Sequence, residues 1–186
     1  MKTKIILLTL SLMLTCMLNG QTKPEAASVI LNKAYKQAAA DKKNVLVIFH
    51  ASWCGWCKKL EASINDTLCK DYFAKSYVIV YLDILETSKK ELENPGAIDI
   101  FDQNGGKGGG VPYFLFFDKK GKLLADSKMK PAGSDANAKP ENIGCPTTPE
   151  EISAFVEILR KTSKISDKEI AAIAERFKKN KNQSAH

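Results

Sequence analysis

The chain has 186 residues, of which 44% are hydrophobic and 26% are charged. This composition is typical of one globular domain and excludes both a wholly disordered chain and a small disulfide-rich protein. The formal net charge is +7, but the lysines are spread along the sequence without a clustered patch or interleaved aromatic residues, so nucleic-acid binding is not expected.

Residues 1–20 have the layout of a secretory signal peptide. Lys2 and Lys4 precede a mostly apolar stretch over 5–18, which is shorter than the roughly 20 residues that span a bilayer. We expect cleavage at Gly20–Gln21 and export to a bacterial periplasm. An uncleaved membrane anchor and lipoprotein-type processing before Cys16 are the two alternatives. In an oxidising compartment, the cysteines that remain tend to pair or react.

The region over 21–180 reads as one α/β domain. Apolar residues at helical spacing predict a helix over 24–40, and continuous runs rich in Val and Ile predict buried strands at 45–49 and 77–82. The further elements expected before residue 126 are a helix at 57–68, a short helix at 97–103, a glycine-rich mobile connection at 105–110, and a hairpin of strands at 112–117 and 122–125.

Two helices are expected near the C-terminus, after a polar loop over 126–147. Thr148 and Ser166 each precede a Glu by three residues, which is the signature of a capping box at a helix start. The second of these helices is expected at about 166–179, and 181–186 is expected to be a disordered tail. One compact domain with terminal helices is the simplest organisation of these elements.

The segment Trp53-Cys54-Gly55-Trp56-Cys57 carries the chemistry. It follows a buried strand directly and opens a helix, so both sulfurs lie on the first helical turn, close enough to form a disulfide. The unpaired N–H groups and the helix dipole favour a thiolate on the first cysteine. We expect Cys54 to be the exposed attacking thiol and Cys57 to resolve the mixed disulfide.

Other uses of these cysteines are less well supported by the spacing. A c-type haem requires His after the second cysteine, where this chain has Lys58. A zinc site would have to add Cys69 and Cys145, which do not form a second close pair. We therefore expect no metal and no cofactor, although a permanent structural disulfide at the motif remains an alternative.

Cys69 and Cys145 leave two alternatives open. They could form a second, structural disulfide, which would close a loop of roughly 75 residues and contribute about 4 kcal/mol in the chain-entropy account. They could instead be two separate buried thiols.

Two segments resemble the thioredoxin superfamily. Residues 45–59, VLVIFHASWCGWCKK, resemble its strand, C-x-x-C and helix segment, and Gly110-Val111-Pro112 before YFLFF resembles its cis-proline loop. The resemblance covers about 26–162. It is similar in particular to exported bacterial thioredoxin-like proteins, including the C-terminal domain of the thiol:disulfide interchange transmembrane reductant.

The resemblance implies a thioredoxin fold, which is a three-layer α/β/α structure with a central mixed β-sheet, here with an N-terminal helix and extra C-terminal helices. It also implies a thiol:disulfide oxidoreductase that exchanges dithiols and disulfides with protein substrates. It implies that Val111–Pro112 is cis and lies against the cysteines, where the backbone could pair with an extended substrate. Trp53, Gly55 and Trp56 would shape and tune the site. The partners implied are protein thiols or disulfides and a membrane thiol-disulfide electron donor or acceptor, with the protein itself a monomer.

The chain departs from thioredoxins at two positions before the motif. Ile48 stands where thioredoxins carry a buried Asp, and His50 stands where they often carry an aromatic residue. The interchange domain has a Glu at the position that matches Glu61, in a C-x-x-C-K-x-x-E pattern. We predict that Glu61 shuttles protons for Cys57, from which it is one helical turn away; a solvated surface role is the alternative.

Two other classes of function remain to be distinguished from redox catalysis. One is a binding or chaperone-like module on the same fold without significant redox turnover. The other is a protein whose dithiol binds a metal. Insulin reduction separates the first from an enzyme, and metal analysis of the reduced protein tests the second.

Overall fold

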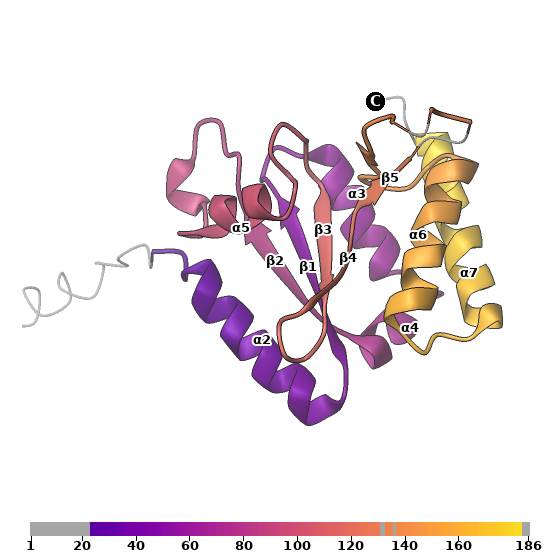
Figure 1. The fold of residues 1–186 in the computed structure, drawn as a ribbon, viewed down its shortest axis with the longest axis horizontal. Helices are drawn as coiled ribbons and strands as arrows, with labels where there is room; N and C mark the ends of the chain where they lie inside the picture. Colours follow the sequence, from indigo (N-terminus) through magenta and orange to yellow (C-terminus); the bar gives the residue numbers. More distant parts are fainter. Residues whose placement is uncertain (1–22, 131–132, 136, 184–186) are drawn as a thin grey trace, which may run out of the picture.

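The computed structural model describes residues 23–130, 133–135 and 137–183 (Figure 1). The expected leader, its cleavage site and Cys16 lie outside the described residues, as do 184–186. Among the helices that are described, none combines the length and the apolar character needed to cross a bilayer.

A mixed four-stranded sheet forms the centre of the molecule, in the order β2-β1-β3-β4. The strands are β1 (Asn44–His50), β2 (Tyr77–Asp83), β3 (Tyr113–Phe117) and β4 (Leu123–Asp126). β1 is parallel to β2 and antiparallel to β3, with Phe49 opposite Tyr113, and β4 returns beside β3 as a hairpin. The sheet is built from the hydrophobic runs that predict buried strands.

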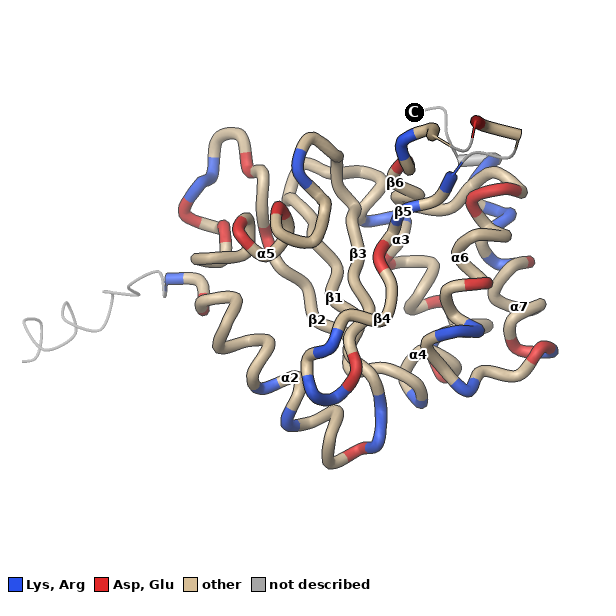
Figure 2. Tube along the Cα trace, viewed as in Figure 1, with Lys and Arg blue, Asp and Glu red and all other residues tan. Residues whose placement is uncertain are grey.

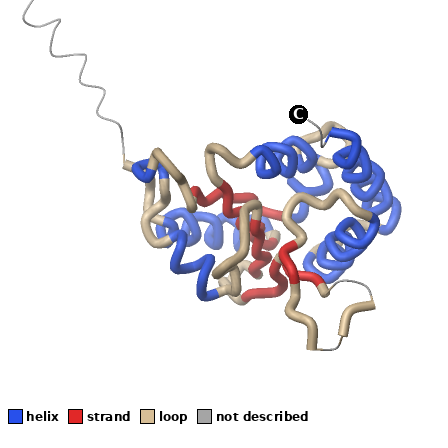
Figure 3. Tube along the Cα trace, turned by 90° about the horizontal axis from the view of Figure 1, so that it is seen from above, coloured by secondary structure: helices blue, strands red, loops and turns tan. Residues whose placement is uncertain are grey.

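Helices cover both faces of this sheet (Figures 1 and 3). The helices α2 (Ala27–Asp41) and α5 (Ala97–Gln103) pack on one face. The other face is covered by α3 (Gly55–Ile64), α4 (Lys70–Ser76), α6 (Pro149–Thr162) and α7 (Asp167–Lys178). The architecture is the expected three-layer α/β/α thioredoxin fold, with an N-terminal helix and extra C-terminal helices.

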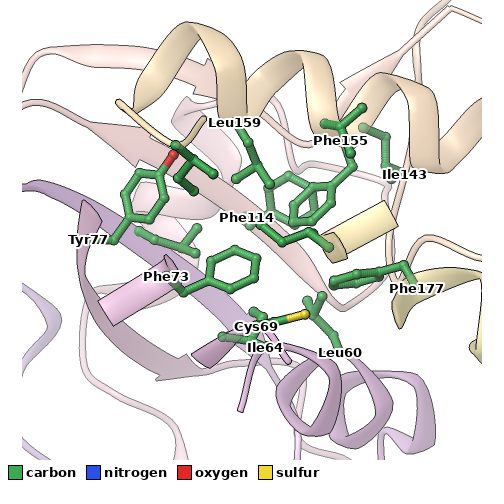
Figure 4. Close-up of a cluster of buried hydrophobic side chains, with 14 of the residues drawn as sticks. Leu60, Ile64, Cys69, Phe73, Tyr77, Phe114, Ile143, Phe155, Leu159 and Phe177 are labelled. Carbon is green, nitrogen blue, oxygen red and sulfur yellow. The ribbon is translucent and has the colours of Figure 1, made fainter. Parts of the chain in front are cut away.

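Side chains alternate along β1 between two separate cores. Leu46 and Ile48 point to the core shared with the C-terminal helices, whereas Val45, Val47 and Phe49 point to the core under α2 and α5. Figure 4 shows the first of these cores. All five residues are buried, which is the environment that favours a continuous apolar strand over an alternating one.

Several predicted boundaries differ from the structure. The first helix begins at Ala27 rather than at residue 24. The helix predicted over 57–68 begins at Gly55 and ends at Ile64, and α4 follows as a separate helix. The break is a turn at Asp66, whose side chain accepts from the Leu68 N–H at 3.0 Å and from Arg176 Nε at 2.5 Å.

The C-terminal part of the chain contains more secondary structure than the sequence predicts. A small hairpin of β5 (Lys128–Met129) and β6 (Glu141–Asn142) forms inside the polar loop. The expected capping boxes at Thr148 and Ser166 are both present. Of the tail predicted over 181–186, residues 181–183 belong to a 3₁₀ segment, Lys179–Gln183. Within this segment, Asn180 is 1% exposed and hydrogen-bonds to Ser63, Arg176 and Pro146.

Candidate active site

Cys54 and Cys57 form a disulfide at the N-terminus of α3, with their Cα atoms 5.3 Å apart. Cys54 is the N-cap residue of this helix, and its Sγ accepts a hydrogen bond from the Cys57 N–H at 3.0 Å. A side-chain acceptor at an N-cap satisfies one of the helix's unpaired N–H groups. After reduction, the same N–H and the helix dipole would stabilise a thiolate on Cys54.

Both cysteines are covered, so the prediction of an exposed Cys54 is wrong for the disulfide form. Cys54 is 3% exposed and Cys57 is 4% exposed. The disulfide packs with Ala51 on one side and with Val111 on the other, and the Val111 carbonyl oxygen is 3.5 Å from Cys54 Sγ. A substrate that reaches the Cys54 sulfur must therefore contact the residues that surround the disulfide.

The Val111–Pro112 peptide is cis and lies beside the dithiol. The sheet explains why two motifs so far apart in sequence meet. Because Phe49 at the end of β1 pairs with Tyr113 at the start of β3, the loop that follows β1 and the loop that precedes β3 share one edge of the sheet.

Asn142 holds the cis-proline loop in place from β6. Its Nδ2 donates to the carbonyl oxygens of Gly110 at 3.1 Å and Pro112 at 3.0 Å. Its Oδ1 accepts from Ser127 Oγ at 2.7 Å and from the Gly144 N–H at 3.1 Å. The amide therefore uses its full hydrogen-bonding capacity. The sequence does not predict this role of Asn142, because an asparagine inside a polar loop carries no signal of a distant partner.

Glu86 holds the other side of the motif. It is only 2% exposed, and its carboxylate accepts from the Ser52 N–H at 2.5 Å and the Ser52 Oγ at 2.7 Å. Burial by itself raises the pKa of Glu86, but the two Ser52 hydrogen bonds, aided by His50 and Lys89, lower this pKa below its ordinary value. The carboxylate therefore remains ionised, and it fixes the residue two positions before Cys54. The sequence does not predict this role of Glu86 either.

The two tryptophans of the motif present large aromatic surfaces to solvent. Trp53 is 53% exposed, and its Nε1 donates to the Leu85 carbonyl oxygen at 2.9 Å. Trp56 is 42% exposed, and Lys59 Nζ lies 4.3 Å from the centroid of its ring. Each ring is thus oriented by one polar contact while most of its face stays accessible.

A small cavity adjoins the dithiol. It has a volume of about 210 Å³, which is the size of one large side chain. The residues that line it come from the motif, the cis-proline loop and the start of α6: Trp56, Val111, Pro112, Ile143, Gly144, Cys145, Thr147 and Glu151. The lining of the cavity combines polar and apolar groups and has one carboxylate, that of Glu151.

Glu61, the predicted proton carrier, lies on the exposed side of α3. Its charge acts on Tyr81, whose pKa is raised to about 12, mainly by burial and further by Glu61. Ile48, at the position of the acid found in thioredoxins, is buried in the core. The acid-base pair at this edge of the sheet is instead His50 and Asp83, with Nε2 and Oδ1 3.2 Å apart. Burial raises the pKa of Asp83, and His50 partly offsets this effect.

Cys69 and Cys145 are separate buried thiols, so the second disulfide that the sequence allowed is not formed. Cys69 packs in the core beside Leu60 and Ile64 (Figure 4), whereas Cys145 lies at the small cavity and accepts from Asn180 Nδ2 at 3.5 Å. Burial raises the pKa of Cys69 to about 11 and that of Cys145 to about 12. Across the described residues, no three side chains of His, Cys, Asp or Glu are grouped as a metal would require.

The comparison with protein families agrees with this geometry. A family model described as thioredoxin-like matches residues 26–119, a span that includes both cysteines of the motif and Pro112. The chain belongs to the thioredoxin-like family. It thus combines a thioredoxin-like fold with a Cys54–Cys57 pair at disulfide distance.

Three solved structures are similar to this thioredoxin-like protein. A disulphide isomerase from Xylella fastidiosa is 22% identical, with 59% of this chain and 79% of that chain covered and a TM-score of 0.47. The oxidoreductase DsbH is 19% identical, with coverage of 77% and 85% and a TM-score of 0.44. A thioredoxin from Nicotiana alata is 15% identical, with coverage of 78% and 100% and a TM-score of 0.40.

Proposed function

We propose that this protein is an exported thiol:disulfide oxidoreductase that exchanges its Cys54–Cys57 pair with protein substrates. The observation that carries the proposal is the position of this disulfide, at the N-terminus of α3 and against the cis Val111–Pro112 peptide. A helix start that stabilises a thiolate beside a second cysteine is what reversible dithiol exchange requires.

The exchange proceeds in two balanced steps. The Cys54 thiolate attacks one sulfur of a substrate disulfide, which forms a mixed disulfide and releases the other substrate sulfur as a thiolate. The Cys57 thiolate then attacks the Cys54 sulfur, which restores the Cys54–Cys57 disulfide and releases the second substrate thiol. Two electrons pass from the protein to the substrate, and the reverse sequence oxidises a substrate dithiol.

The surroundings of the dithiol suit an extended polypeptide as substrate. Trp53 and Trp56 offer exposed aromatic faces, and the backbone at Val111 lies beside the sulfur, where a substrate strand could add main-chain hydrogen bonds. The 210 Å³ cavity at Trp56 and Pro112 would accept one side chain of that strand. The disulfide isomerase and the oxidoreductase with related structures are consistent with a protein substrate.

We further propose that the protein acts in a bacterial periplasm. The proposal rests on the leader-like residues 1–20, with cleavage at Gly20–Gln21 and lipid attachment at Cys16 as its alternative. In that compartment, a membrane thiol-disulfide protein would return the dithiol to its working state. The similarity to the interchange reductant favours such a partner.

Insulin reduction in the presence of dithiothreitol tests the activity. The wild-type protein should accelerate precipitation of the insulin B chain, and Cys54→Ser should remove the acceleration. In a separate incubation without dithiothreitol, reduced Cys57→Ser should instead trap a mixed disulfide between Cys54 and insulin. Cys69→Ser is the matched control, because it removes a buried thiol outside the site. A wild-type protein that does not accelerate the reaction would favour the binding-module function.

The reduction potential of the pair then gives its direction. Equilibration with dithiothreitol or glutathione, followed by thiol trapping, should place a reductant near −270 mV and an oxidant near −120 mV. Metal analysis of the purified reduced protein tests the remaining alternative, since bound metal at one equivalent would favour a metal-binding dithiol.

A further inference from the structure

A strongly basic cavity lies at the end of the molecule opposite the dithiol. Its volume is about 580 Å³, within the range of about 300–1,000 Å³ that is usual for ligand sites. Four segments that are distant in sequence line it: the end of α2 with the start of β1, the end of α4, the β3–β4 turn, and the end of α6. We call this cavity the basic pole. Its lining residues include seven lysines: Lys42, Lys43, Lys75, Lys119, Lys120, Lys161 and Lys164.

The basic pole holds most of the net charge of the chain. It includes seven of the 28 basic residues and one of the 21 acidic residues, Asp118, so it accounts for six of the seven net positive charges. The lysines that look dispersed in the sequence are brought together by the fold, at the end where α2, α4 and α6 finish (Figure 2). The rest of the chain is close to neutral.

The structure neutralises only part of this charge. Lys75 forms an ion pair with Glu169, and Lys43 Nζ lies 3.6 Å from Asp41 Oδ2. The other five lysines form no ion pair within the described part of the chain. Asp118 is already engaged, because its carboxylate accepts from the N–H groups of Lys120 and Lys122, and these hydrogen bonds lower its pKa.

Helix dipoles do not remove the remaining excess. The three helices that end at the basic pole contribute about −0.5 charge each. Together with Asp41 and Glu169, they offset somewhat more than half of the six positive charges, and the cavity remains cationic by about two charges. The lysines of this concave site carry more positive charge than its helix ends and carboxylates neutralise. Such a site is suited to binding an anion from solution.

We propose that the basic pole binds a phosphate-bearing anion with two or more negative charges. Ammonium groups from the β3–β4 turn and the end of α6 would face the phosphate oxygens from two sides, as point charges that need no fixed geometry. The same chemistry is offered by the head groups of anionic phospholipids and by soluble polyphosphates.

The basic pole is separate from the redox site. Asn44 lines the pole at the start of β1, and the loop that carries Cys54 follows the other end of this seven-residue strand, which is about 20 Å long. An anion can therefore occupy the pole without covering the dithiol. If the anion belongs to a membrane surface, the bound protein would present Cys54 toward the solution.

Binding measurements with a triple variant test this proposal. In Lys119→Gln/Lys120→Gln/Lys164→Gln, three lysines without ion pairs are removed from two sides of the cavity. The matched control is Lys36→Gln/Lys139→Gln/Lys168→Gln, which removes the same charge at exposed positions outside the cavity. Both variants should keep the wild-type rate of insulin reduction and the wild-type circular dichroism spectrum, because neither changes the dithiol or the core.

The two probes are sodium tripolyphosphate in calorimetry and vesicles of phosphatidylglycerol, with phosphatidylcholine vesicles as reference. We expect the wild-type protein to bind at least one of the two anionic probes. The triple variant should bind about a hundredfold more weakly, because each lysine near an anionic surface contributes roughly a factor of five. The control variant should stay within about twofold of wild type.

Each outcome is informative. Binding of tripolyphosphate at one equivalent identifies a soluble ligand, whereas binding that requires phosphatidylglycerol identifies a lipid head group. Equal losses in the triple and control variants would overturn the proposal, since the attraction would then depend on net charge alone. Failure of the wild-type protein to bind either anionic probe at low salt would overturn it as well. Neither result would affect the redox proposal, which is read from insulin reduction.

Discussion

Replacement of Asn142 by Ala should weaken the fold and displace the cis-proline loop. The side chain makes four hydrogen bonds, and water can replace only the one to the exposed Gly110 carbonyl. The Pro112 carbonyl, the Gly144 N–H and the fully buried Ser127 hydroxyl would lose their partners. At about 1 kcal/mol for each of these three groups, the free energy of unfolding should fall by about 3 kcal/mol.

Urea denaturation measures the loss of unfolding free energy, thermal denaturation measures the shift in unfolding temperature, and the insulin assay measures the effect on the redox site. The unfolding temperature should fall by about 6–12 °C, at about 2–4 °C per kcal/mol for a domain of this size. The rate of insulin reduction should fall by about tenfold, because small displacements of positioned groups have effects of this order or larger. Asn137→Ala is the matched control, since that exposed asparagine lies in the same loop and its side chain makes no hydrogen bond to any of the described residues.

Two results would refute this reasoning about Asn142. An unfolding free energy within about 0.5 kcal/mol of wild type would mean that water replaces all four bonds. A large loss of stability with an unchanged rate of insulin reduction would mean that the amide stabilises the β5–β6 hairpin without positioning Pro112.

Three further predictions concern titratable groups. In the oxidised native protein at pH 8, Cys69 and Cys145 should not react with Ellman's reagent, because burial holds their pKa values near 11 and 12; two thiols should appear on unfolding. If Glu61 carries protons for Cys57, Glu61→Gln should shift the pH dependence of Cys57 alkylation. Because the folded-state pKa of Glu86 lies below its ordinary value of 4.5, its stabilising contribution should be complete above pH 4.5 and lost as the pH falls through the folded value. Glu86→Gln should therefore flatten the acid limb of the stability curve.

These three predictions have distinct contradictory outcomes. Absence of free thiols after unfolding would indicate a disulfide between Cys69 and Cys145. A pH profile for Glu61→Gln that superimposes on wild type would assign Glu61 to the solvated surface, with the exposed Glu91→Gln as control for loss of one negative charge. Stability curves of Glu86→Gln and wild type that run parallel from pH 6 to 3 would show that the Ser52 contacts do not depend on ionisation.

Local patterns in the sequence predict the elements whose partners are near in the chain. The short helix at 97–103 and the strands of the sheet follow from hydrophobic runs, and both capping boxes depend on residues three positions apart. The dithiol motif is similarly local, because helix geometry alone places Cys54 at the N-cap. For these features, the physical cause lies within a few residues of its effect.

The predictions fail where the cause is distant in sequence. Asn180 is buried because Ser63, from α3, provides its partner, and no local pattern indicates this contact. Cys54 is covered because Val111, from the loop before β3, packs on it. The same reason explains why Asn142, Glu86 and the basic pole were not foreseen: each depends on residues that only the folded chain brings together.

The pairing of Phe49 with Tyr113 fixes the position of Cys54 relative to Pro112 independently of how stable the whole domain is. Cys54 follows Phe49 by five residues and Pro112 directly precedes Tyr113, so strand register fixes how sulfur and proline face each other. A slip of one residue would exchange the side chains of β1 between two cores that differ in shape, which makes the register very costly to change. Substitutions that remove buried side-chain volume from either core should therefore lower the melting temperature and leave the reduction potential unchanged.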